Sequence, residues 1–470
     1  MKVDFAKLDR AFNPKCIVVI GDKGPNFQWS KSQSNFKGKL YSIQIDPKEI
    51  EGIEALGVTN FTSLMDVPEP VDLAIVAVPR EITPRILEDL IRKDVAAAHF
   101  FTAGFGETHT EEGIKLEQRL IDMAEEANFH LIGPNCMGVR NPRAGVGQVV
   151  EEIDNSFAGS LGFISQSGMH AGGLIREAQI QGMNTGKSVS YGNGIVLDST
   201  DYLEYFGRDP EISGIGIYLD GVKDGSRFLK VLSDVTTRKP VVIWKGGRTE
   251  EGRRASSSHT GSLAVPHDVW EAGIRQSGAL NAYRTDELID TLRAIQYLSP
   301  VGGGRVAITG GGGGQSIALA DVFSEAGLQV PMLAQEALDE FATFLTLIGA
   351  SYLNPIDTGN ENRAHMPRIL EVMEKDTNTD NLVMLMGARA GSGPQFETML
   401  KNLAGIRKRA VKPVMVVLPV TFSSEDVQQA GDTIKKLQKE GIATFVSLER
   451  GARALKQALD YYNLKNRVSS

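Results

Sequence analysis

Cysteine is nearly absent from this chain of 470 residues, and long apolar runs are missing. The two cysteines, Cys16 and Cys136, lie in apolar or tight-turn surroundings and form no Cys-x-x-Cys pair. This pattern argues against a disulfide framework or a zinc site and favours a reducing compartment. No apolar run reaches the roughly 18 residues that a membrane helix needs, and residues 1–10 lack the apolar stretch of a signal peptide. We therefore expect a cytoplasmic protein with no membrane segment and no bound metal.

An excess of positive charge is also missing, because the formal net charge is -8. A nucleic acid or an anionic membrane is therefore not indicated as a general partner. A local basic pocket for a phosphorylated ligand is compatible with this charge.

Glycine, by contrast, is plentiful: the 50 glycines exceed the usual share of about 7%. They gather where short apolar runs give way to stretches of helical length, which is typical of parallel α/β sheets. The pattern predicts a Rossmann-like domain over residues 1–145 and two further parallel-sheet domains over residues 146–300 and 301–470. The runs cover residues 16–20, 40–45, 71–78, 98–102 and 129–132, then 160–164, 187–190, 215–219 and 240–244, then 305–309, 382–386, 413–418 and 443–446.

The most informative stretch is residues 256–264, in which His259 is surrounded by serine, threonine and glycine. A neutral imidazole is nucleophilic and unprotonated near pH 7, and its small neighbours leave room for a large anion at the ring. The pattern suits a histidine that is phosphorylated and carried between sites. The alternative is a polar surface loop that happens to contain a histidine. The composition of residues 256–262 predicts a mobile loop.

Two groups of polar residues follow predicted strands of the middle domain, at the ends where open parallel sheets bind ligands. Ser165-Gln166-Ser167-Gly168 stands between a strand and a helix, so its hydroxyl and backbone N–H groups offer an anion site. Asp220 ends another strand, where a carboxylate can accept an imidazole N–H and stabilise the charge that develops in phosphoryl transfer. The alternatives are an ordinary serine N-cap and an Asp220 that caps the next helix.

A glycine loop, Gly21-Asp22-Lys23-Gly24, follows the first predicted strand. It is not a GxGxxG fingerprint, because Asn26 and Phe27 occupy the later positions, so a nicotinamide-dependent enzyme is only weakly indicated. Asp22 would oppose a phosphate, and solvated lysines beside a plain turn are the alternative. The lysines that lie nearby in the sequence, as candidates for holding phosphates, are Lys23, Lys31, Lys37 and Lys39.

Other motifs have less specific interpretations. Residues 133–138 suit a tight turn, either beside a ligand or purely structural. The glycines of residues 310–314 lack the Lys-Ser/Thr of a Walker A loop, so we interpret them as a turn that a ligand can approach. Residues 354–357 are interpreted as a turn, and His170 and His267 receive no role.

Taken in order, these motifs resemble the α subunit of the NDP-forming acyl-CoA synthetases. The likeness is greatest to the ADP-forming acetyl-CoA synthetase type, within the succinyl-CoA synthetase superfamily. It runs through nearly the whole chain, and its most specific piece is Ser258-His-Thr-Gly-Ser-Leu-Ala264. The other pieces are residues 8–15, 46–48, 77–79, 102–107, 133–136, 165–168, 201–206, 245–248 and 354–357.

The resemblance implies a CoA-binding Rossmann domain followed by two flavodoxin-like domains. It also implies a reversible reaction in which an acid, CoA and ATP give acyl-CoA, ADP and inorganic phosphate. An acyl phosphate would form first, and its phosphoryl group would pass to His259 and then to the nucleotide. Residues 165–168 would receive the phosphohistidine, and Asp220 would stand where the family commonly has glutamate. The implied CoA-binding residues are Gly21, Lys23, Lys48, Pro79, Thr102, Ala103 and Asn135.

The three predicted domains leave no room for the ATP-grasp domains that bind nucleotide in this family. The resemblance therefore implies a separate ATP-grasp β subunit that binds ATP or ADP with Mg2+, and a hetero-oligomer whose substrate is a small carboxylic acid or its acyl-CoA. The sequence departs from the family in its first glycine loop, at Asp220 and at Val265-Pro266. The altered first loop and Asp220 motivate the alternative of a non-catalytic, regulatory protein that binds CoA or acyl-CoA.

Overall fold

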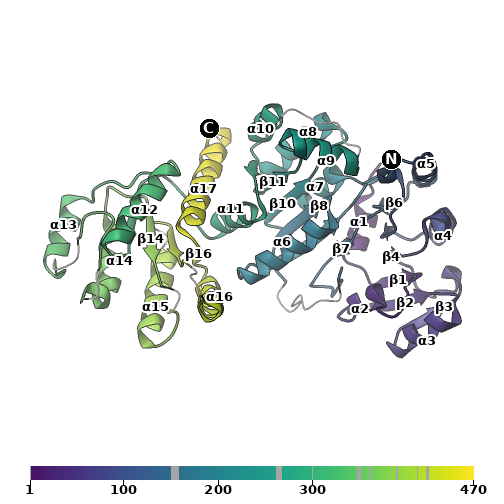
Figure 1. Ribbon diagram of the computed structural model, residues 1–470, viewed down its shortest axis with the longest axis horizontal. Coiled ribbons are helices and arrows are strands. Elements are labelled where there is room, and N and C mark those ends of the chain that lie inside the picture. The colour runs from purple at the N-terminus through teal and green to yellow at the C-terminus, as the bar shows by residue number, and fades with distance from the viewer. Residues whose placement is uncertain are drawn as a thin grey trace. The chain divides into compact units, whose positions relative to one another are not determined.

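The computed structural model describes residues 2–149, 158–260, 267–298, 300–346, 351–358, 361–387, 390–409, 411–419 and 423–469. Its internal contacts divide the chain into two compact units. The first comprises Met1–Ala178 and Asn184–Thr285, and the second comprises Gln179–Met183 and Asp286–Ser470 (Figure 1). The division into three domains at residues 145 and 300 stays a prediction. Among the helices of the described residues, none combines the length and the apolar character needed to cross a membrane.

The first unit begins with a six-stranded parallel sheet in the order β3-β2-β1-β4-β5-β6. This is the doubly wound Rossmann order, in which the direction of winding reverses between β1 and β4. Strands β1, β4 and β5 are buried throughout, as their apolar sequences predict. The strands are β1 (Cys16–Ile20), β2 (Lys39–Ile43), β3 (Thr59–Phe61), β4 (Leu73–Val76), β5 (Ala97–Phe100) and β6 (His130–Ile132). The helices are α1 (Phe5–Phe12), α2 (Gln28–Ser32), α3 (Pro47–Ala55), α4 (Thr83–Arg92) and α5 (Glu111–Glu126), with 3-10 turns η1 (Leu64–Asp66), η2 (Arg80–Ile82) and η3 (Gly106–Thr108).

A second six-stranded sheet follows in the order β12-β11-β10-β8-β9-β7. Strands β8 to β12 are parallel and have the flavodoxin order, which confirms the predicted fold class for this part of the chain. The strands are β7 (Gly138–Arg140), β8 (Leu161–Ser165), β9 (Thr185–Ser190), β10 (Gly214–Leu219), β11 (Val241–Lys245) and β12 (Leu280–Ala282). The helices are α6 (Gly168–Ile180), α7 (Ser199–Arg208), α8 (Gly225–Thr236), α9 (Glu250–Thr260), α10 (His267–Gln276) and α11 (Thr285–Tyr297).

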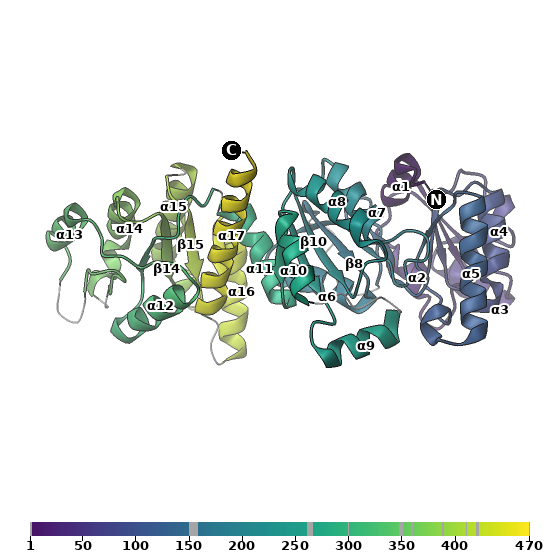
Figure 2. The same cartoon turned by 90° about the horizontal axis from the view of Figure 1, so that it is seen from above.

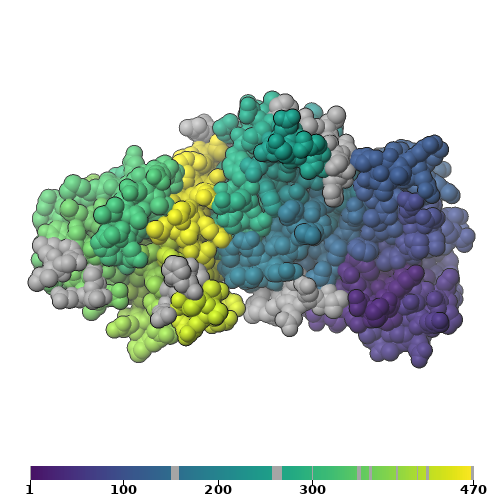
Figure 3. All heavy atoms as spheres, viewed as in Figure 1, coloured from purple at the N-terminus to yellow at the C-terminus, as the bar shows by residue number. Residues whose placement is uncertain are grey.

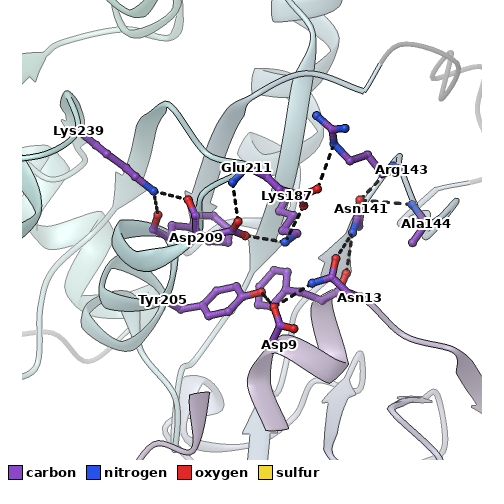
Figure 4. A network of polar contacts seen from close by, with 12 residues as sticks. Asp9, Asn13, Asn141, Arg143, Ala144, Lys187, Tyr205, Asp209, Glu211 and Lys239 are labelled. Atoms are coloured by element: carbon purple, nitrogen blue, oxygen red, sulfur yellow. Dashed lines mark hydrogen bonds and ion pairs between the residues drawn. The ribbon is translucent and has the colours of Figure 1, made fainter. Parts of the chain in front are cut away.

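The two sheets of the first unit are tied together by a polar network (Figure 4). Lys187 on β9 is buried and pairs with Asp209 at 2.6 Å and with Glu211 at 3.0 Å. Beside it, the Tyr205 hydroxyl on α7 donates to the Asp9 carboxylate on α1 at 2.9 Å. Strand β7 makes a second connection. It follows β6 of the first sheet along the chain, but it pairs antiparallel with β9 of the second sheet. In Figure 3 the teal atoms of the part of the chain that contains the second sheet adjoin the blue atoms of the part that contains the first.

The second unit is built on a parallel sheet in the order β13-β14-β15-β16. Asn354 supports its first strand, since its side chain accepts the N–H of Ile308 and donates to the carbonyls of Val306 and Pro331. The strands are β13 (Val306–Thr309), β14 (Asn381–Leu385), β15 (Val414–Val417) and β16 (Ala443–Phe445). The helices are α12 (Gly313–Glu325), α13 (Gln335–Ala342), α14 (Met366–Lys375), α15 (Pro394–Arg409), α16 (Ser424–Lys439) and α17 (Leu448–Ser469), with the 3-10 turn η4 (Glu361–His365).

Candidate functional site

The direction of winding in the second sheet reverses between β8 and β10, and ligands of doubly wound sheets bind outside the carboxyl ends of strands at such a point. Ser165 is paired with Tyr218, and Tyr218 with Trp244, so the ends of β8, β10 and β11 are level at one edge. The structure therefore brings the predicted residues 165–168 and Asp220 to the same edge.

The junction between β8 and α6 presents a helix start with no acidic residue in its first turn. The Ser165 hydroxyl donates to the carbonyl of Ser167 at 2.6 Å, and the Ser167 hydroxyl accepts the N–H of His170 at 3.3 Å. Helix α6 has 13 residues and no acidic residue in its first turn. Because the first N–H groups of a helix have no partner within it, the geometry of this end of α6 is compatible with the predicted anion site.

Gln166 joins this junction to Asp220. Its side-chain oxygen accepts the backbone N–H of Asp220 at 2.9 Å, and its own backbone N–H donates to the carbonyl of Tyr218. The interpretation of Asp220 as the cap of the next helix is wrong, because the Asp224 side chain accepts the N–H of Arg227 at the start of α8. The Asp220 carboxylate instead accepts the Tyr218 hydroxyl at 2.8 Å.

His259 lies near the end of α9, which spans Glu250–Thr260. The prediction of a loop is therefore wrong for residues 256–260, whereas residues 261–262 and the His259 side chain lie outside what the structure describes. Two glutamates in the first turn favour this helix. Gly247 lets it pack closely, since a Cβ there would lie 3.2 Å from the Ser256 Cβ. Helix α9 contacts η3, the turn that precedes α5 (Figure 2).

The corresponding junction of the first sheet, after β1, has its N–H groups occupied by carboxylates of the chain. Asp22 is buried, and its carboxylate accepts the N–H groups of Ser30 at 2.7 Å and of Lys23 at 3.2 Å. Glu49 accepts the N–H of Gly24 at 2.7 Å. The helix that follows, α2, has only five residues. A phosphate at this junction would have to displace Asp22 or Glu49.

The predicted lysine cluster does not assemble at this junction. Lys39 begins β2 and is paired with Cys16, so it lies at the opposite, amino-terminal edge of the sheet from Gly21. Lys37 lies beside that same edge and donates to the carbonyl of Arg143 at 3.0 Å. The prediction that these two lysines approach the glycine loop is wrong, because a five-residue strand of about 16 Å separates the two edges.

Most of the other predicted CoA-binding residues gather at one edge of the first sheet. Pro79, Thr102 and Asn135 follow the adjacent strands β4, β5 and β6. The Thr102 hydroxyl donates to the carbonyl of Val78 at 2.6 Å, and the Thr102 carbonyl accepts the N–H of Asn135 at 2.9 Å. Lys23, Lys48 and Ala103 are exposed in the loops and helix starts along this edge.

Sequence reasoning missed a carboxylate that organises the neighbouring loop. Glu107 accepts the N–H groups of Gly104 at 2.6 Å and Phe105 at 3.1 Å. Its side chain also accepts the Asn193 amide at 2.7 Å, which links the loop after β5 to the loop after β9. Burial raises the pKa of Glu107, but the hydrogen bonds from the backbone and from Asn193 together outweigh burial, so the pKa is lowered. The six-residue stretch 102–107 contributed to the resemblance, but nothing in it indicated this pairing.

Comparison with known proteins matches both sheets of the first unit. Residues 27–142 match a CoA binding domain, and residues 158–295 match the succinyl-CoA ligase like flavodoxin domain. The first match begins beyond the Gly21–Gly24 loop. The fold and its junctions are thus those of a CoA-binding domain joined to a ligase-type flavodoxin domain.

Full-length relatives define the family more narrowly. The chain is 33% identical to the alpha subunit of acetate–CoA ligase [ADP-forming] II from Pyrococcus furiosus, over 95% of this chain and 96% of that one. It is 32% identical to acetate–CoA ligase [ADP-forming] I from Archaeoglobus fulgidus, over 95% of this chain but 63% of that one. Acetyl-coenzyme A synthetase 1 of Ca. Korarchaeum cryptofilum, solved with phosphate and ADP, superposes with a TM-score of 0.83 at 28% identity, covering 98% of each chain. The chain belongs to the family of ADP-forming acetate–CoA ligase alpha subunits.

Proposed function

We propose that the chain acts as the α subunit of an ADP-forming acid–CoA ligase. Acyl-CoA and inorganic phosphate give an acyl phosphate and CoA. This step takes place at the carboxyl ends of the strands in the two sheets of the first unit. The imidazole of His259 then attacks the phosphorus, which releases the carboxylate and leaves a phosphohistidine. Transfer of this phosphoryl group to ADP gives ATP and restores the imidazole, and every step is reversible.

The observation that carries the proposal is the junction between β8 and α6. A 13-residue helix starts there without an acidic residue, and Gln166 fixes Asp220 beside it. The helix dipole and the N–H groups of the first turn would stabilise the phosphoryl group, and the Asp220 carboxylate would accept the N–H of the ring nitrogen that is not phosphorylated. Helix α9, which carries His259, belongs to the same compact unit.

A separate β subunit with ATP-grasp domains would supply the nucleotide site and its Mg2+. The relatives support this part, because the chain covers 96% of the Pyrococcus furiosus alpha subunit but 63% of the Archaeoglobus fulgidus enzyme. The remaining third of that longer protein would correspond to the partner. CoA would bind along the edge formed by Pro79, Thr102 and Asn135.

The test is His259→Ala, measured as acyl-CoA-dependent ATP synthesis with the β subunit present and as CoA binding by calorimetry. Turnover should fall by at least a thousandfold, since a nucleophile that forms a covalent intermediate is lost, while the CoA dissociation constant stays within about twofold. His267→Ala, a change at a histidine on α10 that pairs with Glu271, is the matched control and should keep full turnover. Turnover retained in His259→Ala would contradict the mechanism and favour the non-catalytic alternative.

A further inference from the structure

Tyr218, the penultimate residue of β10, makes a hydrogen bond that has no part in the proposed mechanism. Tyr218 is buried, and its hydroxyl donates to Oδ1 of Asp220 at 2.8 Å. Burial and the neighbouring Asp220 raise the pKa of this phenol. The hydroxyl therefore remains protonated at neutral pH and acts as a donor to the carboxylate.

Neighbouring residues hold both the backbone and the side chain of Asp220 in place. Its backbone N–H is fixed by Gln166, and its carboxylate oxygen Oδ1 is fixed by the Tyr218 hydroxyl. Gly246, at the end of β11, leaves the necessary space. A Cβ at Gly246 would lie 2.7 Å from Asp220 Oδ1 and 2.9 Å from the Tyr218 hydroxyl oxygen, so a larger residue would displace the pair.

The ring of Tyr218 is itself held in place by two aromatic side chains. The His170 ring, on the first turn of α6, lies 4.2 Å from it between centroids, and the Trp244 ring on β11 lies 4.7 Å from it. His170 and Trp244 also contact each other, at 4.7 Å. Burial lowers the pKa of His170, against the opposing effect of Asp220. A neutral imidazole is suited to packing against an aromatic ring, so the position of the hydroxyl is set by packing before any ligand arrives.

We infer that Tyr218 is a positioning residue, which orients the Asp220 carboxylate so that its second oxygen is free to accept the N–H of phosphorylated His259. The inference rests on the proposed function. An aspartate side chain has two torsions, and its half-buried carboxylate would otherwise rotate. Because the Tyr218 hydroxyl donates to Oδ1 of Asp220, Oδ2 is the oxygen that accepts the imidazole N–H. A misplacement of about 1 Å at such a site costs on the order of a hundredfold in rate.

Tyr218→Phe tests this inference, because it removes only the hydroxyl and keeps the ring that packs against His170. The measurement is the rate of phosphate incorporation into His259, once from acyl-CoA and phosphate and once from ATP, Mg2+ and the β subunit. The first rate should fall about 10- to 100-fold, and the second should change less than about twofold. The matched control is Tyr205→Phe, which removes a buried hydroxyl that donates to Asp9 at 2.9 Å, and it should leave both rates unchanged.

The role of Asp220 in this effect is tested by combining variants. In an Asp220→Ala background, Tyr218→Phe should slow the reaction from acyl-CoA by less than about twofold, since a residue that acts through another has no effect once that other is gone. Gly246→Ala, which keeps the hydroxyl but crowds the pair, should slow the same reaction and provides a second variant if Tyr218→Phe folds poorly.

Three outcomes would overturn the inference. They are an unchanged rate from acyl-CoA in Tyr218→Phe, an equal loss in both reactions, or the same loss in the Asp220→Ala background as in the wild type. Absence of phosphate on wild-type His259 would instead overturn the proposed function, and this inference with it.

Discussion

Two strand–helix junctions, after β1 and after β8, occupy the same position in their sheets. They differ in the groups that accept their backbone N–H groups. Both follow a buried central strand at the point where the winding of its sheet reverses. After β1, the Asp22 carboxylate accepts the N–H of Ser30, and the Glu49 carboxylate accepts that of Gly24. After β8, the acceptor in the first helical turn is the neutral hydroxyl of Ser167.

This difference shows that glycine content is a poor guide to anion binding. The loop after β1 has two glycines and is filled by negative charge, whereas the loop after β8 has one glycine at the start of a 13-residue helix and no acidic residue. A carboxylate that caps a helix start both satisfies its N–H groups and repels a second anion. Of these two junctions, the one after β8 is therefore the better suited to a phosphoryl group, whereas the one after β1 is occupied by side chains of the chain itself.

The largest effect on the rate of phosphorylation is expected when the junction after β8 is given a carboxylate, as the junction after β1 has. Ser167→Asp keeps a cap for the N–H of His170 but places a carboxylate beside the phosphoryl group. Two unit charges about 4 Å apart repel by about 4 kcal/mol at an effective dielectric constant near 20, so phosphorylation of His259 from acyl-CoA should slow about 1000-fold. Ser167→Asn, which caps without charge, is the control. Equal rates in the two variants would show that charge at this junction does not matter.

A variant in the first sheet, away from the junction after β8, separates effects on folding from effects on the proposed phosphoryl site. His99 on β5 is buried beside Trp29, and its ring nitrogens have no hydrogen-bond partner among the described residues. Burial lowers the pKa of His99 from 6.5 to about 3. Below pH 6.5 the unfolded chain therefore binds a proton that the folded chain excludes, and stability falls as the pH falls.

Replacing this histidine should remove that acid sensitivity. At about 1.4 kcal/mol per pH unit, His99 costs about 2 kcal/mol at pH 5 relative to pH 7. In His99→Leu, urea unfolding should show a loss of stability between these pH values that is about 2 kcal/mol smaller. Exposed His365→Leu is the control, and phosphorylation of His259 at pH 7 should be unaffected in both variants. An unchanged pH dependence in His99→Leu would show that His99 is protonated in the folded chain.

The smallest effect on ligand binding is expected when the charge of Asp22, at the junction after β1, is removed. Asp22→Asn keeps an oxygen for the N–H of Ser30 and removes the charge, so the CoA dissociation constant should change less than about twofold, or 0.4 kcal/mol. Asp22→Ala should lower the free energy of unfolding by about 1 kcal/mol, because the cap is lost. Calorimetry with CoA and urea unfolding measure the two quantities. CoA binding that tightens tenfold in Asp22→Asn would place a phosphate of CoA at this junction.

Much of the fold could be predicted from short apolar runs, and the exceptions have physical causes. The run at residues 215–219 becomes β10, and that at residues 240–244 becomes β11 shifted by one residue. Strands β3, β7 and β12 were missed, because three residues in an edge strand carry no distinct apolar pattern. The helix at residues 256–260 was missed because serine favours loops and caps, whereas the glutamates at the start of α9 decide its structure.

The site was predictable where it follows strand ends and not where it depends on side-chain pairing. Strand ends alone place Ser165 and Asp220 at one edge. The occupation of the first loop by Asp22 and Glu49 depends on a residue 25 positions away from Gly24, which no local pattern reveals. The Tyr218–Asp220 hydrogen bond could have been predicted, because residues two apart along a strand face the same side. The sequence pattern of residues 215–220 was interpreted only as a strand and its end.

The most direct measurement is acid-labile phosphate on the wild-type chain, mapped to a peptide by mass. The chain would be incubated with inorganic phosphate and a panel of acyl-CoAs, and separately with ATP, Mg2+ and the β subunit. Phosphate on His259 from both directions is the expected result, and the acyl-CoA that labels best would name the substrate class. Bound CoA with no phosphate on His259 from either direction would contradict phosphoryl transfer through this chain.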